Sequence, residues 1–167
     1  MGIAEGRRSA PEDRWSWARD VGLSAEEIPT PALLLDIDIA TANASLMGER
    51  FRSLSASLRP HVKAHKCAEL ARLQLDHGAI GVTTATLAEA EAMASAGVGD
   101  VLIANEVVGA AAAERLALIA ASTRLTVAAD DESNLAELGR RASGAGSEIG
   151  VLIEVDVGMG RGGASSP

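Results

Sequence analysis

Aromatic residues are almost absent from this sequence of 167 residues: they make up 2% of it, and there is no tyrosine. Hydrophobic residues nevertheless make up 47%, so the core must be built from alanine, leucine, isoleucine and valine. The single cysteine, Cys67, excludes an internal disulfide and is typical of a reducing compartment. A chain of this length can form one domain with a substantial core.

The sequence also has no long basic run and no long apolar run. Its formal net charge is -8, which argues against a surface that binds nucleic acid or an anionic membrane. No stretch reaches the roughly 18 consecutive apolar residues of a membrane-spanning helix, and the N-terminus lacks the apolar segment of a signal peptide. We therefore expect a soluble, cytoplasmic protein that binds neither nucleic acid nor membrane.

The chain divides by composition into a polar N-terminal extension, residues 1–28, and a folded part, residues 29–167. In the folded part, short apolar runs alternate with stretches of helical periodicity, which is typical of repeated βα units and a parallel sheet. The runs begin 21 to 25 residues apart. The expected strands are Leu33–Ile37, Leu58–Ala64, Ile80–Ala85, Val101–Ala104, Leu125–Ala129 and Ile149–Val157.

Two architectures fit this alternation: a doubly wound open sheet, and a (β/α)8 TIM barrel of which about six βα units are present. Polar residues follow the carboxyl ends of several strands, where either fold places its site. A barrel gathers such residues into one mouth, so we favour the incomplete barrel. The residues are Lys63, Thr84, Asn105, Asp130 and Arg161.

The octapeptide 59–66 concentrates two lysines, two histidines and an arginine. If residues 58–64 form a strand, alternation places His61, Lys63 and His65 on one face. A desolvated lysine there has the neutral amine that reacts with carbonyl groups. The alternative is a solvated edge strand without chemistry.

The second polar cluster is the glycine-rich stretch 154–163. It contains G-x-G-x-x-G, but no helix can follow it in this sequence, so we reject a dinucleotide site. A glycine-rich turn can instead return Arg161 to the strand end, where Glu154 could orient it for an anionic oxygen; the alternative is a surface arginine. No residues have convincing metal-site spacing: His61 and His65 would lie about 13 Å apart on a strand.

Together these segments resemble the fold-type III pyridoxal-phosphate (PLP) enzymes, which have an alanine-racemase-like N-terminal barrel. The resemblance is greatest to the D-threonine aldolase and D-serine dehydratase group. It rests on residues 30–36, 59–66, 105–109 and 154–161. Members of that family continue through two more barrel units and a C-terminal β-domain, so we expect the chain to be an N-terminal part, without that β-domain.

The resemblance implies roles for four residues. Lys63 matches the lysine that holds the cofactor as an internal aldimine, and Lys66, beyond the strand, is the weaker alternative. Arg161 matches an arginine near the phenolic oxygen of the cofactor. Glu154 stands where racemases often carry a carbamylated lysine, and we count it, with His61, among the cofactor-binding residues. A divalent metal is implied for the complete family member, with ligands outside this chain.

The implied function is that of a PLP-dependent lyase acting on small D-amino acids, D-threonine aldolase-like, which converts D-threonine to glycine and acetaldehyde. A D-serine dehydratase, an amino-acid racemase and a non-catalytic PLP-binding protein remain open alternatives. The racemase would need a catalytic tyrosine, which this sequence does not contain. The complete enzyme is expected to be a homo-oligomer.

Overall fold

The computed structural model describes residues 21–165, which belong to two units, Met1–Ile37 and Asp38–Pro167. In the first unit, a short 3-10 helix, η2 (Ala25–Glu27), begins where the Ser24 backbone N–H donates to Glu27 Oε2 at 2.9 Å. The predicted strand Leu33–Ile37 is wrong: residues 33–36 join no sheet, and Ile37 begins helix α1 (Ile37–Arg52). Leu33 is exposed, so apolar composition alone, without a neighbouring strand, did not produce a strand.

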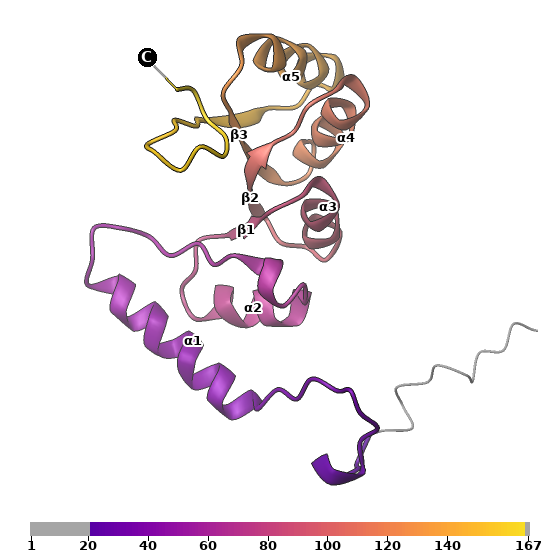
Figure 1. Ribbon diagram of the computed structural model, residues 1–167, viewed down its shortest axis with the longest axis vertical. Coiled ribbons are helices and arrows are strands. Elements are labelled where there is room, and N and C mark those ends of the chain that lie inside the picture. Colours follow the sequence, from indigo (N-terminus) through magenta and orange to yellow (C-terminus); the bar gives the residue numbers. More distant parts are fainter. Residues whose placement is uncertain (1–20, 166–167) are drawn as a thin grey trace, which may run out of the picture. The chain divides into compact units, whose positions relative to one another are not determined.

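The second unit is built on a parallel sheet of four strands in the order β1 (Val82–Thr84), β2 (Asp100–Glu106), β3 (Arg124–Ala129) and β4 (Ile149–Ile153). Between them come α3 (Leu87–Ser95), α4 (Ala110–Ala120) and α5 (Glu132–Ala145), which stack along one side of the sheet (Figure 1). A doubly wound sheet would reverse its strand order and carry helices on both faces. The sequential order with one helical layer is that of a barrel, here not closed, as predicted.

The core lies between this face of the sheet and the helices. Paired positions of the parallel strands share a face, so Val82, Val101 and Leu125 form one row toward the helices. Leu116 of α4 and Leu138 of α5 are fully buried against them. The row on the opposite face is more polar: Thr83, Leu102, Thr126 and Gly150. In a barrel, that face lines the interior.

The predicted strand Leu58–Ala64 is only partly present. The Ile80 and Thr83 backbone N–H groups donate to the carbonyls of Leu58 and Pro60, and His61 forms a single parallel bridge with Thr83. The chain then turns into a 3-10 helix, η3 (Val62–Ala64), before α2 (Ala68–Asp76). The prediction that His61, Lys63 and His65 share one face of a strand is therefore wrong, because residues 62–64 are not extended.

Helices α3 and α5 each begin at a residue whose side chain caps the first turn. Thr86 caps α3 by accepting from the Glu89 backbone N–H, and Asp131 caps α5 by accepting from that of Asn134. In a capping box Glu89 would accept from the Thr86 N–H. Here its carboxylate accepts from Ala85 instead.

Candidate active site

Lys63 lies just beyond the carboxyl end of the segment that runs beside β1. Its backbone N–H donates to Nδ1 of His61 at 3.3 Å, within the first turn of η3. The Lys63 side chain is exposed, and no ion pair with a carboxylate is found for it among residues 21–165. The desolvation expected for this amine from sequence is thus not provided by the residues described. The amine is accessible at the carboxyl end of the sheet.

The imidazole of His61 is half-buried beside Lys63. Burial is the main cause that lowers the His61 pKa below 6.5, and the positive charge of Lys63 lowers it further. The carboxylate of Glu89 and a backbone hydrogen bond with Thr83 act in the opposite direction. A neutral His61 ring is also what its contact requires, because Nδ1 must carry a free lone pair to accept from Lys63.

Other strands bring polar residues to the same edge, as the barrel prediction required. Thr84 is the last residue of β1, Asn105 and Glu106 end β2, and Asp130 follows β3. The Asn105 amide donates to the Ala85 carbonyl at 3.3 Å, which links the ends of β1 and β2. Parallel strands thus bring Asn105, Glu106 and Asp130 to one edge. The Thr84 side chain is instead fully buried on the helix-covered face, because it alternates in step with Val82.

The glycine-rich stretch after β4 folds back on the strand ends. The Asp156 carboxylate accepts from the backbone N–H groups of Gly158 and Gly160 at 2.8 and 3.0 Å. The Gly163 N–H donates to the Asp130 carboxylate at 3.0 Å. Gly163 has φ +99°, and a Cβ there would lie 2.6 Å from the Asp156 nitrogen. Only glycine fits this turn without displacement.

Beneath this turn, Glu154 lies in an acidic environment that the sequence did not reveal. Burial is the largest cause that raises the pKa of Glu154, followed by the charge of Glu106, a hydrogen bond with Glu106, and the charge of Asp130. Arg161 acts in the opposite direction through its charge. Glu106 Oε1 is buried and has no hydrogen-bond partner within residues 21–165.

Arg161, carried by the turn, is exposed. Within the described residues no ion pair or hydrogen bond joins its guanidinium to Glu154; the two side chains interact only through charge at longer range. The glycine-rich turn therefore returns Arg161 to the neighbourhood of the strand ends. The direct contact with Glu154 stays a prediction.

A further charged contact near Lys63 was missed by the sequence analysis. The ammonium of Lys66 forms an ion pair with Glu89, on the first turn of α3. Lys66 itself has φ +51°, which is rare for a residue other than glycine. The unusual spacing of two lysines three residues apart was visible in the sequence, but their separate partners were not.

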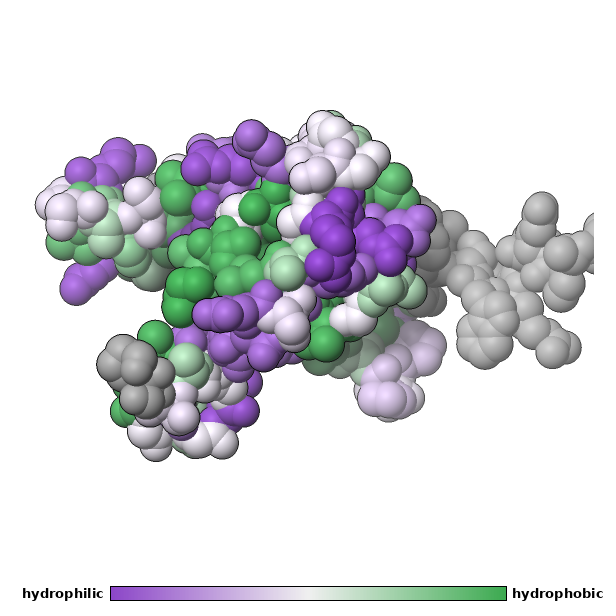
Figure 2. Space-filling model, turned by 90° about the horizontal axis from the view of Figure 1, so that it is seen from above, coloured by the Kyte–Doolittle hydropathy of each residue, from purple (hydrophilic) through white to green (hydrophobic). Residues whose placement is uncertain are grey.

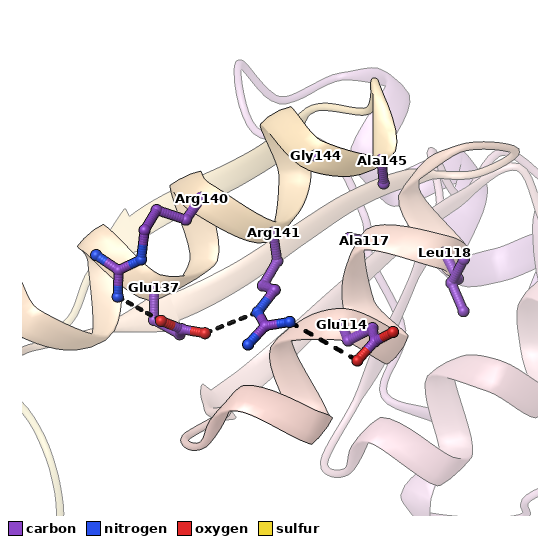
Figure 3. A pocket seen from close by; sticks show the side chains of 8 residues that line it. All are labelled: Glu114, Ala117, Leu118, Glu137, Arg140, Arg141, Gly144 and Ala145. Carbon is purple, nitrogen blue, oxygen red and sulfur yellow. Dashed lines mark hydrogen bonds and ion pairs between the residues drawn. The ribbon is translucent and has the colours of Figure 1, made fainter.

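A groove with a volume of about 570 Å³ lies elsewhere, between α4 and α5 (Figure 3). Its charged side chains pair with one another: Arg141 contacts both Glu137 and Glu114, and Arg140 contacts Glu137. Figure 3 shows that the Arg141–Glu114 pair bridges the two helices, whereas both pairs of Glu137 lie within α5. We attribute this groove to helix packing, because the charges at its wall already have partners and none of the strand-end residues line it.

Among residues 21–165, no group of three or more histidine, cysteine, aspartate or glutamate side chains is arranged to hold a metal ion. Within the same residues, no helix has the length and apolar character needed to cross a membrane.

The singly wound sheet with a lysine at its mouth indicates a lysine-bearing barrel protein. Comparison with known proteins indicates the same class of protein. The family profile described as alanine racemase, N-terminal domain, matches residues 35–167. The chain belongs to this family, which is the barrel of the fold-type III PLP enzymes.

Two curated relatives and one solved structure specify the likeness further. The chain is 41% identical over 138 residues to a D-threonine aldolase from Arthrobacter sp., covering 83% of this chain and 36% of the relative. It is 38% identical over 147 residues to a 3-hydroxy-D-aspartate aldolase from Paracoccus denitrificans, covering 87% and 38%. The crystal structure of D-threonine aldolase from Filomicrobium marinum superposes with a TM-score of 0.80 at 41% identity, covering 82% and 37%. The chain thus spans just over a third of the length of these relatives.

Proposed function

We propose that this chain is the lysine-bearing part of a PLP-dependent lyase that acts on β-hydroxy D-amino acids, and that its reaction is the cleavage of D-threonine to glycine and acetaldehyde. The observation that carries the proposal is the placement of Lys63. It is an accessible amine at the carboxyl end of a sheet whose family uses PLP. The similarity to two aldolases favours aldol cleavage among the reactions of this family.

The residues at this edge fit PLP by their chemistry. Lys63 would hold the aldehyde carbon, because its amine is not engaged by a carboxylate within the described residues. Arg161 would bind the phenolic oxygen as a charge-assisted donor. When bound, PLP supplies an electron-withdrawing ring for charge that develops at the substrate Cα.

The protein groups then have separate tasks. His61 is held neutral by burial and by the charge of Lys63, so an uncharged imidazole lies beside the reactive amine. Its Nδ1 accepts a hydrogen bond from the backbone N–H of Lys63. Glu154 lies beneath the turn that carries Arg161, and its carboxyl group holds a proton more readily than usual because of burial and Glu106. We propose that Glu154 orients the Arg161 side chain.

The test is borohydride reduction of the PLP-loaded protein that joins this chain to the rest of its barrel, followed by peptide mapping. The label should be on Lys63. Lys63→Ala should abolish the absorbance of the lysine-bound cofactor, whereas Lys66→Ala should keep it. Label on Lys66 with Lys63 unmodified would refute the assignment.

Product analysis distinguishes the competing functions. An aldolase releases glycine and acetaldehyde from D-threonine, whereas a dehydratase releases a 2-keto acid and ammonia. The dehydratase alternative is supported by the 40% identity over 77 residues to a D-threo-3-hydroxyaspartate dehydratase from Delftia sp.. A racemase would invert only Cα and convert D-threonine to L-allothreonine without either set of products, and a non-catalytic binding protein would take up PLP without turnover.

A further inference from the structure

Two lysines of this site are close enough to compete for one aldehyde. Lys63 and Lys66 are three residues apart, so their Cα atoms are separated by at most about 10 Å. The intervening chain is η3 and its capping residue, not an extended strand, which shortens that distance. Both side chains are exposed. Some feature of the fold must therefore decide which amine reacts.

The two amines differ in their partners. The Lys66 ammonium is paired with the carboxylate of Glu89, whereas no carboxylate pairs with Lys63 in the part of the chain described. The backbone at Lys66 has φ +51°, and its N–H donates to the Val62 carbonyl at 2.7 Å. This turn conformation, rare for lysine, brings residue 66 to α3.

Glu89 is held firmly in place for this contact. Its side chain is only 10% exposed, compared with 66% for that of Lys66. One carboxylate oxygen accepts from the Ala85 backbone N–H at 2.8 Å, and its own N–H donates to the Thr86 hydroxyl at 3.2 Å. The hydrogen bond from Lys66, followed by that from Ala85, lowers the pKa of Glu89, so the carboxylate is ionised at neutral pH.

We propose that Glu89 is a specificity-determining residue that occupies the Lys66 amine, so that an aldehyde cofactor is attached to Lys63 alone. The inference rests on the proposed function, which makes Lys63 the attachment site. In the attachment step, the nitrogen lone pair attacks the aldehyde carbon, a carbon–nitrogen double bond forms, and the carbonyl oxygen leaves as one water. A nitrogen held as an ammonium on a carboxylate has no lone pair for this attack.

Because Lys66 is exposed, its ion pair with Glu89 is expected to be weak, but a weak ion pair is sufficient for this role. An ion pair with one exposed partner contributes little to folding stability. Selection between two amines needs a much smaller free-energy difference than folding does, because even a tenfold preference directs most of the cofactor to one lysine. The function of Glu89 is therefore expected in the distribution of the label and not in the stability of the protein.

The experiment measures that distribution in the protein that joins this chain to the rest of its barrel. PLP is added, borohydride reduces the carbon–nitrogen double bond to a secondary amine, and mass spectrometry quantifies the label on the peptides of Lys63 and Lys66. The unaltered protein should carry it on Lys63. In Glu89→Gln, the share on Lys66 should rise roughly tenfold, as expected from the loss of one charge-assisted hydrogen bond.

Glu91→Gln is the matched control. Glu91 lies two residues further along α3 and pairs with Arg115, so the substitution removes an ion pair of the same type from the same helix. Its labelling pattern should equal that of the unaltered protein. A rise of Lys66 labelling in Glu91→Gln as large as in Glu89→Gln would overturn the proposal, because the effect would then be a general loosening of α3.

The single variant Lys63→Ala gives a test that does not depend on the folding of Glu89→Gln. In Lys63→Ala, with Glu89 intact, Lys66 should stay unlabelled although its competitor is gone; efficient labelling of Lys66 there would refute the role of Glu89. In the double variant Lys63→Ala, Glu89→Gln, Lys66 should gain label. If the unaltered protein carries no label on Lys63, the proposed function itself fails, whereas label on Lys63 in an unchanged ratio in Glu89→Gln contradicts only the present inference.

Discussion

The His61 imidazole lies between two opposite influences, the ammonium of Lys63 and the carboxylate of Glu89. Because its pKa is lowered, protonation of His61 costs more in the folded than in the unfolded protein. Its contribution to stability is therefore present above about pH 6.5 and is lost as the pH falls through the lower folded-state value. An NMR titration of the ring should give a midpoint below 6.5.

The cause can be separated by substitution. Lys63→Met removes the charge and keeps the shape of the side chain, so the His61 midpoint should move upward. It should not return fully to the ordinary value, because burial is the larger cause. A midpoint that does not respond to Lys63→Met would show that the charge of Lys63 does not reach the ring.

Arg161 is the second residue whose substitution tests the site. Arg161→Ala in the PLP-binding protein should weaken cofactor binding about tenfold or more, since hydrogen bonds between charged groups contribute about 1.5–3 kcal/mol. Arg124→Ala is the control, because Arg124 is also exposed but begins β3, at the opposite end of the sheet. Equal PLP dissociation constants for Arg161→Ala and the unaltered protein would identify Arg161 as a surface residue only.

Among the elements, α1 approaches the C-terminal end of α2 closely at Gly48. A Cβ at Gly48 would lie 1.7 Å from the carbonyl oxygen of His77, the C-cap of α2. Replacement of a mid-helix glycine by alanine normally stabilises by about 0.5–1 kcal/mol. At this distance the clash outweighs that gain, since overpacking costs about 1–3 kcal/mol. Gly48→Ala should lower the denaturation midpoint.

Gly139→Ala provides the opposite sign within the same protein. Gly139 lies inside α5, and nothing approaches a Cβ there within 4 Å. Because only the helix propensity changes, this substitution should increase the free energy of unfolding by about 0.5–1 kcal/mol and so raise the denaturation midpoint. A midpoint that rises in Gly48→Ala as it does in Gly139→Ala would contradict the close contact at Gly48.

The sequence predicted the four strands that pair with one another in the sheet. The runs near residues 82, 101, 125 and 149 became β1 to β4, although β2 is longer than predicted and β4 ends at Ile153. The run at 33–37 joins no sheet among the residues described, because a strand also needs a partner, which composition does not specify. The run at 58–64 follows β1 only as far as His61, where the chain turns into η3. Periodicity thus gave the order of the units and not their pairing.

The site was predictable where it depends on strand ends and unpredictable where it depends on side-chain contacts. Asp130 follows β3 as expected, because the position of a strand end follows from the periodicity. The contact of Glu89 with Lys66, and the closeness of Glu106 to Glu154, join residues 23 and 48 positions apart. No local pattern encodes such contacts, since they arise only when helices and strands pack.

At the scale of the second unit, the sheet presents one covered and one less covered face. Helices α3 to α5 bury the first, whereas β4 at the sheet edge keeps exposed apolar side chains. They are Val151, Leu152 and Ile153, with Val155 and Val157 beyond the strand. Figure 2, seen from the end at which α5 lies, shows hydrophobic surface gathered in the middle of the view. Such a surface requires a cover, because an apolar edge strand pairs readily with other chains.

The last prediction concerns residues 1–167 expressed alone: they should form neither a stable monomer nor an active enzyme. A barrel is free of edges only when its first and last strands pair, and among the strands that the structure describes β4 pairs with β3 alone. Ile153 and Val157 are 66% and 91% exposed. Against a domain stability of about 5–15 kcal/mol, the missing burial is expected to be decisive.

Sedimentation, thermal unfolding and PLP absorbance of this chain test the prediction together. We expect concentration-dependent association, a broad transition and no specific absorbance of bound cofactor. Because cofactor binding stabilises a fold only where it binds the folded form tightly, added PLP should not sharpen the transition. A monodisperse monomer with a cooperative transition and bound PLP would instead mean that the four-stranded sheet is a self-sufficient domain, with a cofactor site built from Lys63 and the glycine-rich turn alone.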